Sequence, residues 1–158
     1  MTQALFDAID RGDDALVRTL LDAGADPNAV DARGWSALAH ATHNAELDRG
    51  FPDVAKALID AGADIEAPIG YGIRPLMLAA GYGETAVVQL LLDAGADVLA
   101  RNDGGLTALM MVKEKFYIDV INLLYEAEHA AGVGEGSCTT KHPPGASVIT
   151  FRKRPAGE

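Results

Sequence analysis

The sequence Leu91-Leu92-Asp93-Ala94-Gly95-Ala96-Asp97 decides the fold, because close copies of it occur twice earlier in the chain. The copies are residues 20–26 (LLDAGAD) and residues 58–64 (LIDAGAD), at successive spacings of 38 and 33 residues. Ten residues after the last Asp of each copy, a second matched element begins, at Ser36, Arg74 and Thr107. Two elements linked in a fixed register indicate an internal repeat.

The repeat between residues 74 and 101 predicts a first helix that begins at Pro75. Proline suits the first helical position, because the N–H that it lacks would have no partner inside the helix. The helix then carries a narrow stripe of mostly small apolar residues, which lets neighbouring helices approach closely. This stripe consists of Leu76, Ala79 and Ala80.

A second helix is expected over residues 85–93, after a turn made by Gly81 and Gly83. Its apolar face consists of Val87, Val88, Leu91 and Leu92. Gly95 is expected to end this helix in the left-handed conformation, which glycine adopts at no steric cost.

A 33-residue unit that starts like Thr-Pro-Leu-His and ends in Leu-Leu-x-x-Gly-Ala-Asp resembles the ankyrin repeat, and the resemblance extends from about residue 3 to residue 127. It implies an all-α solenoid of stacked antiparallel helix pairs joined by β-hairpin-like loops. Stacks of this kind need about three or more units to bury a continuous core. The four units expected here are about residues 1–30, 31–68, 69–101 and 102–131.

The first and last units depart from the pattern in the way that caps do. The first starts directly with a helix, ends it at a turn at Gly12, and has an apolar face made of Leu5, Phe6, Ala8 and Ile9. The last has Phe116 where the turn glycine belongs and Glu128 where the capping glycine belongs.

The second unit is five residues longer, and aligning Gly50 with Gly83 places the extra residues at positions 45–49, between its two helices. Insertions in repeat proteins map to loops on one face, which is often the binding face. The alternative is a slightly longer first helix followed by a tolerated surface loop, because lengthening a loop costs little entropy.

The ankyrin resemblance implies that a protein partner contacts the hairpin tips and the exposed ends and inner face of the first helices. The corresponding hairpin-tip positions are Arg33, Trp35, Tyr71, Ile73, Asp103 and Leu106. The corresponding helix-end positions are His43, Asn44, Tyr82, Lys115 and Tyr117. Tryptophan, tyrosine and arginine often dominate interface energetics. The alternative is that Trp35 and Tyr71 pack across adjacent hairpins and stiffen the stack.

Motifs for catalysis or metal binding are weak. His40 and His43 lie three residues apart, but no further ligand stands at a recognisable spacing, so we expect structural roles for both. Cys138 and His142 form an isolated pair in the tail, and such a pair rarely serves as a nucleophile or as a metal ligand. The glycine-rich stretches lack the Lys-Ser/Thr of a phosphate-binding loop. We therefore expect no enzyme activity, no metal and no cofactor.

The charge is unevenly distributed along the chain. Residues 1–131 contain 21 Asp and Glu against 9 Lys and Arg, a net charge of −12, whereas residues 132–158 contain 2 against 4, a net charge of +2. An acidic body repels nucleic-acid phosphates. We expect a protein partner with a basic surface and no nucleic acid.

Several sequence features indicate the cellular compartment of the protein. The single cysteine, Cys138, cannot close a disulfide within the chain. The first residues lack the basic start and apolar run of a signal peptide, and no apolar stretch approaches the roughly 20 residues that span a membrane. We expect a cytoplasmic monomer that does not engage membranes.

Residues 132–158 form a Gly/Pro-rich tail outside the repeats. It contains a β-prone run at residues 147–151, followed by Arg152, Lys153 and Arg154. One hypothesis is that this segment folds back onto the acidic stack and occupies part of the binding groove until a partner displaces it. The alternative is a separate docking peptide or a disordered end.

The sequence leads to two functional hypotheses. The first is a non-enzymatic protein–protein interaction module, whose rigid stack binds without a large ordering cost. The second is an acidic inhibitor or immunity-type protein that blocks a basic enzyme or toxin, because negative charge speeds association with a positive cleft.

Overall fold

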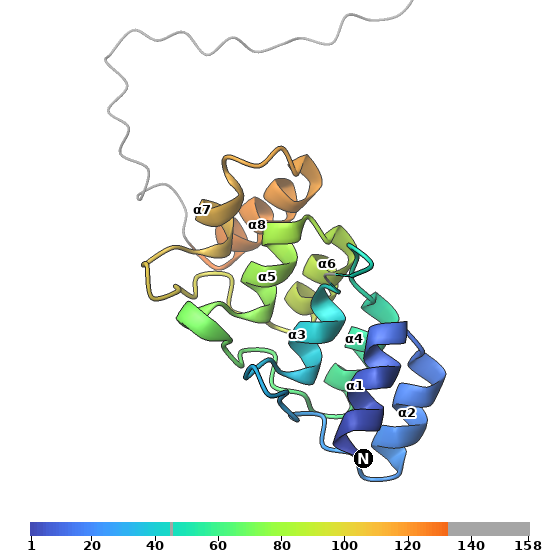
Figure 1. Ribbon diagram of the computed structural model, residues 1–158. Coiled ribbons are helices and arrows are strands. Elements are labelled where there is room, and N and C mark those ends of the chain that lie inside the picture. The colour runs from blue at the N-terminus through green and yellow to red at the C-terminus, as the bar shows by residue number, and fades with distance from the viewer. Residues whose placement is uncertain (45, 133–158) are drawn as a thin grey trace, which may run out of the picture.

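The computed structural model describes residues 1–44 and 46–132, and over these residues it contains eight α-helices, one short 3-10 helix and no strand. The helices are α1 (Thr2–Arg11), α2 (Asp14–Asp22), α3 (Ala37–Thr42), α4 (Pro52–Asp60), η1 (Gly70–Gly72), α5 (Pro75–Tyr82), α6 (Thr85–Asp93), α7 (Ala108–Val112) and α8 (Ile118–Ala130). The eight α-helices form four consecutive pairs, and Figure 1 shows these pairs stacked one on another. The predicted all-α solenoid is therefore confirmed. The hypotheses about the tail fall on residues 133–158, outside this description.

The helices form two rows with the core between them. The first helices α1, α3, α5 and α7 pack successively against one another, and the second helices α2, α4, α6 and α8 do the same. Leu38, Leu58, Val88 and Leu91 are among the side chains that the two rows bury completely or nearly so, in a single continuous apolar cluster. Each such side chain contributes about 1.5–3 kcal/mol through removal from water.

Helix α5 begins at Pro75, as predicted, but two details of its prediction are wrong. The apolar stripe is not narrow, because α5 lies between α3 and α7 and covers α6, so that all of residues 75–80 are buried. Gly81 lies inside the helix, and only Gly83 turns the chain, with φ 77°. The predicted second helix and the left-handed Gly95, with φ 91°, are confirmed.

The last Asp of each repeated motif starts a connecting hairpin by accepting the backbone N–H two residues further on. These bonds join Asp26 to Asn28, Asp64 to Glu66 and Asp97 to Leu99, each at 2.9 Å. The side chains of Asn28 and Glu66 then reach the next unit, where Asn28 Oδ1 accepts from the Asp64 N–H at 2.7 Å and Glu66 Oε1 accepts from the Asp97 N–H at 2.8 Å. Leu99 has no such oxygen, and the position of the fourth unit that corresponds to Asp64 and Asp97 is Ala130, the last residue of α8.

Residues 46–49 of the insertion lie outside any helix. In the first and third units one backbone bond closes the turn between the helices, from Asp13 N to Ala8 O at 3.0 Å and from Glu84 N to Ala79 O at 2.9 Å. The second unit keeps this bond, from Phe51 N to Ala41 O at 2.8 Å, although five more residues lie between its ends. Helix α3 ends at Thr42, so the alternative of a longer first helix is wrong.

Both end units differ from the middle ones. Helix α1 buries Leu5, Phe6, Ala8 and Ile9 before Gly12, as the sequence predicts. In the fourth unit α7 is only five residues long, and α8 continues past Glu128 to Ala130 before Gly132 adopts φ 86°.

Candidate functional site

The six predicted hairpin-tip residues lie on three consecutive hairpins, which project from the same flank of the stack (Figure 1). We call this set the hairpin-tip row: Arg33, Trp35, Tyr71, Ile73, Asp103 and Leu106. The predicted helix-end residues lie at the opposite ends of the first helices, beside the turns between the two helices of each pair. The structure therefore separates the two predicted sets by the length of a first helix.

The first hairpin is held by the carboxylate of Asp31. Its Oδ1 accepts from the backbone N–H groups of Arg33 and Trp35, both at 2.8 Å, and its Oδ2 accepts from Arg33 Nε at 2.8 Å. The Arg33 guanidinium also lies 5.6 Å from the centre of the Trp35 ring. Arg33 is exposed and Trp35 partly buried, so the tip presents a charged group on an aromatic support.

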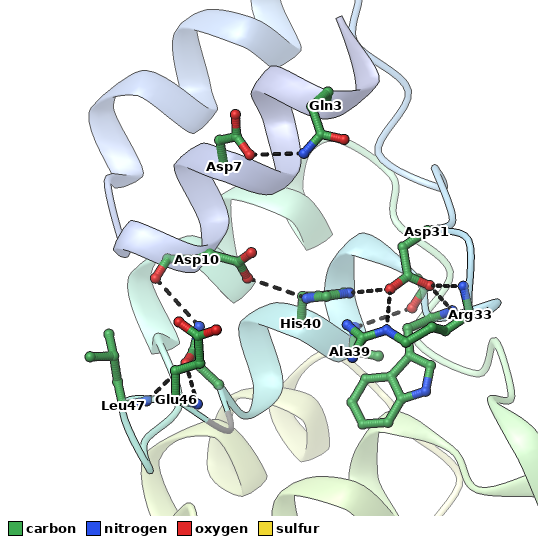
Figure 2. A network of polar contacts seen from close by, with 12 residues as sticks. Gln3, Asp7, Asp10, Asp31, Arg33, Ala39, His40, Glu46 and Leu47 are labelled. Atoms are coloured by element: carbon green, nitrogen blue, oxygen red, sulfur yellow. Dashed lines mark hydrogen bonds and ion pairs between the residues drawn. The ribbon is translucent and has the colours of Figure 1, made fainter.

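His40 connects this hairpin to the first helix pair. Figure 2 shows its ring between two carboxylates, with Nδ1 3.3 Å from Asp10 Oδ1 and Nε2 3.1 Å from Asp31 Oδ2. The ring also meets Phe6 and Trp35 edge to face, with centroids 5.0 and 5.9 Å away. A single side chain thus fixes α1, α3 and the hairpin relative to one another.

These contacts set the ionisation of Asp31. Desolvation raises the pKa of its carboxyl group, but the backbone N–H of Trp35, the Arg33 side chain, the His40 ring and the backbone N–H of Arg33 outweigh it. They hold the pKa of Asp31 well below its ordinary value, so that the carboxylate stays charged.

Tyr71 occupies the second hairpin tip in an unusual conformation. Its side chain is 86% exposed, and its backbone has φ 62° and ψ 25°, in the left-handed region that bulky residues seldom adopt. In this hairpin Ile69 takes the place of Asp31, so no carboxylate organises the turn. The alternative that Tyr71 stiffens the stack by packing across hairpins is wrong, because its side chain is exposed.

The second and third tips are in direct contact. The backbone N–H of Asp103 donates to Tyr71 O at 3.2 Å, and a Cβ at Gly72 would come within 2.7 Å of Asp103 Oδ1. The amide oxygen of Asn102 accepts the Leu106 N–H at 3.0 Å and holds the third hairpin as Asp31 holds the first. Leu106 is exposed beside this tip, whereas Ile73 packs partly against the core.

Two of the predicted helix-end residues are buried, so the expected exposure of these two positions is wrong. The ring of His43 is buried under the ring of Tyr82, and His43 Nδ1 lies 3.3 Å from Glu84 Oε1. Asn44 is also buried. Its amide oxygen accepts from two backbone N–H groups of the inserted loop, those of Glu46 and Leu47, at 2.9 Å each.

The other three helix-end residues are accessible. Tyr82 is 48% exposed on the face away from His43. Lys115 Nζ donates to the carbonyl of Gly81 at 2.6 Å and lies 5.9 Å from the centre of the Tyr117 ring. Tyr117 lines an open hollow of about 470 Å³ together with Phe116, Ile118 and Asp119 among others.

Metal and membrane sites can be assessed for residues 1–44 and 46–132. His40 and His43 have separate partners, because His43 lies just outside the helix and faces the next unit. No group of three or more His, Cys, Asp or Glu side chains among these residues could hold a metal ion. Nor is any helix in this part of the chain both long and apolar enough to cross a bilayer.

The polar cluster around Asp31 and His40 was not predicted from the sequence. The sequence feature that could have indicated it is the pair Asp31 and Gly34, three residues apart, which recurs as Asn102 and Gly105. Both glycines have positive φ, and both polar side chains accept a backbone N–H in the same kind of turn. Asx residues three positions before glycine are typical of such turns.

The comparisons with known proteins agree with this geometry. A family model described as ankyrin repeats (3 copies) matches residues 5–102 and residues 45–134. No curated protein matches the sequence. Ankyrin repeats generally mediate protein–protein interactions and are typically non-enzymatic. The helix pairs, the repeated hairpins and the family match together show that this chain belongs to the ankyrin-repeat family.

Proposed function

We propose that this chain is a non-enzymatic binding module whose protein partner contacts the hairpin-tip row and the adjoining face of the first helices. A cytoplasmic location, a monomeric free state and a basic partner are parts of the proposal. The single cysteine and the net charge of −12 over residues 1–131 support them.

The observation that carries the proposal is Tyr71. A bulky side chain in the left-handed region costs about 1–2 kcal/mol relative to ordinary backbone, and an 86% exposed ring recovers little of this by packing. Folding would therefore be served better by a glycine or asparagine at this position. Tyrosine is a residue type that is common in protein interfaces. Its presence at a loop tip in this unfavourable conformation is better explained by a role in binding a partner.

The neighbouring contacts favour the same surface. The three tips are held by the Asp31 and Asn102 side chains and by the bond from the Asp103 N–H to Tyr71 O, so little loop ordering remains for binding. Arg33 on Trp35, exposed Tyr71 and exposed Leu106 then offer one guanidinium, two aromatic rings and one aliphatic side chain along a row.

Affinity capture on the full chain, followed by titration calorimetry with each purified candidate, tests this proposal. Tyr71→Ala should weaken partner binding by about 2 kcal/mol or more, roughly thirtyfold, as hot-spot residues do. The matched control is Tyr125→Ala, which removes an exposed tyrosine from the distant helix α8. Equal affinities of Tyr71→Ala and the unmodified chain would contradict the proposal.

The second candidate function is the inhibition of a basic enzyme or toxin, and the charge of −12 over residues 1–131 favours it. Steering of this kind acts on the association rate and is screened by salt. A single basic enzyme captured from extract, inhibited by the chain and bound at a rate that falls steeply with ionic strength, would support inhibition. A neutral partner without salt dependence would support the scaffold role.

A further inference from the structure

The fourth helix pair has an apolar outer face that nothing in the described residues covers. Residues of the third and fourth units correspond at a spacing of 33, so Met110 corresponds to Met77 and Tyr125 to Leu92. Met77 is 2% exposed because α7 packs against α5, whereas Met110 is 40% exposed. Tyr125 is 64% exposed, although Leu92 is partly buried against the core.

Ile121 shows the same difference, since it is partly exposed whereas the corresponding Val88 is fully buried. Terminal units of repeat proteins normally present a polar outer face to water. Here Met110, Phe116, Ile121 and Tyr125, which we call the C-terminal end surface, leave apolar side chains partly or largely exposed, alongside the exposed Lys113 and Glu114.

Phe116 distinguishes the turn of the fourth unit from the turns of the first and third units. In the first and third units the glycine of the turn lies under a side chain of the next unit, and a Cβ there would come within 2.5 Å of the Phe51 ring at Gly12 and 2.9 Å of the Tyr117 ring at Gly83. Phe116 takes the place of this glycine and is 97% exposed. A large apolar side chain thus stands exposed in the fourth unit where the first and third units have a glycine covered by the next unit.

We propose that residues 147–154 of the same chain bind the C-terminal end surface. This segment contains Val148, Ile149 and Phe151, which supply apolar groups for the exposed methionine, isoleucine and aromatic rings. Arg152, Lys153 and Arg154 follow directly, and two carboxylates belong to the elements that carry the surface. They belong to Glu114, which follows the exposed Lys113 in the turn after α7, and to Glu128 in the last turn of α8, whose Oε1 also accepts from the Thr107 hydroxyl at 3.2 Å.

The length of the connection suits this contact. Residues 133–146 join Gly132, directly behind α8, to the start of the segment. Fourteen residues of a Gly-rich sequence reach about 20 Å on average, which exceeds the 8–10 Å that separates packed helix axes. Since the contact is intramolecular, the local concentration of the segment is in the millimolar range, and a weak interaction suffices.

A spin label on the full chain tests the proposal. Cys138→Ser removes the only cysteine, and Thr150→Cys places a nitroxide within the segment. We expect the NMR signals of Met110, Ile121 and Tyr125 to lose most of their intensity, while those of α1 keep theirs. Ile149→Asp should restore the signals, because binding of the segment would then bury a carboxylate in place of an apolar side chain, which is unfavourable.

The control is Val133→Asp, the same kind of change outside the segment, which should leave the broadening intact. Undiminished signals at Met110 and Ile121, or equal broadening with and without Ile149→Asp, would overturn the proposal. So would broadening that disappears on dilution together with a dimer seen in sedimentation, because a second copy would then cover the surface. None of these results depends on the hairpin-tip row or on its partner.

Discussion

The imidazole ring of His43 lies parallel to the phenol ring of Tyr82, with their centroids 3.6 Å apart and their planes 5° apart. His43 ends the first helix of the second unit and Tyr82 ends that of the third, so the stacked pair joins successive layers at the edge opposite the hairpins. Glu84 adds a polar contact to His43 Nδ1. The two rings thus stabilise the interface between the second and third layers.

Tyr82→Ala should lower the free energy of unfolding by about 1 kcal/mol, because stacked aromatic pairs contribute about 0.5–1.5 kcal/mol beyond their buried area. Urea denaturation of the full chain measures this loss. Tyr82→Phe keeps the ring and removes only the hydroxyl, so it should stay close to the unmodified chain. An equal loss in both variants would show that the stacking is unimportant.

Asp31→Asn should change how stability depends on acid. The folded-state pKa of Asp31 lies below its ordinary value of 3.8, so the carboxylate stabilises the fold above about pH 4 and this contribution is lost as the pH falls further. The variant should be about 1–3 kcal/mol less stable at neutral pH, since it loses hydrogen bonds to a charged acceptor.

Thermal unfolding at pH 7 and pH 3 measures this difference. Asp31→Asn should lose less stability between the two values than the unmodified chain. Asp60→Asn, which changes an exposed carboxylate that pairs with Lys56, is the control and should keep the larger loss. A variant with the same acid dependence as the unmodified chain would contradict the role of Asp31.

Gly12→Ala should destabilise the stack more than Gly24→Ala. Both glycines have positive φ, 68° and 94°, so both substitutions cost about 1 kcal/mol in backbone strain. Only at Gly12 would the new methyl group meet a neighbour, the Phe51 ring at 2.5 Å, which adds about 1–3 kcal/mol. Equal losses in urea denaturation would mean that the ring moves aside freely.

Asn28→Ala should weaken the link between the first and second hairpins. Its amide group accepts from the Asp64 N–H at 2.7 Å and donates to Gly62 O at 3.3 Å, so its removal should cost about 1–2 kcal/mol. Hydrogen exchange at the Asp64 amide should become faster. Asn122→Ala, on the exposed face of α8, is the control and should leave this amide unchanged.

The sequence predicts the layers well, because the repeated motif contains their local determinants. Gly95 and Pro75 act on the backbone within one or two residues, so helix ends can be read from them directly. The burial of α5 on several sides was missed, because it depends on the neighbours α3 and α7 and not on its own pattern.

The candidate site was predicted only in part, because some of its residues are placed by the repeat itself and others by contacts with neighbouring units. Exposed tips such as Tyr71 follow from the position of a residue in its repeat. The burial of His43 depends on Tyr82 and Glu84, which are about 40 residues away, and on an insertion that changes where α3 ends. Where an insertion changes the end of a helix, the repeat pattern does not predict which residues of the next unit the displaced side chains contact.

The bond from Phe51 N to Ala41 O closes the second turn across the extra residues as its counterparts close the shorter turns. The spacing of the layers therefore does not depend on what lies between Asn44 and Arg49, whose backbones pair at the base of the loop. Foreign peptides grafted at positions 45–48 should be displayed on an intact scaffold. The same independence would let this segment diversify quickly during evolution while the rest of the protein stays fixed.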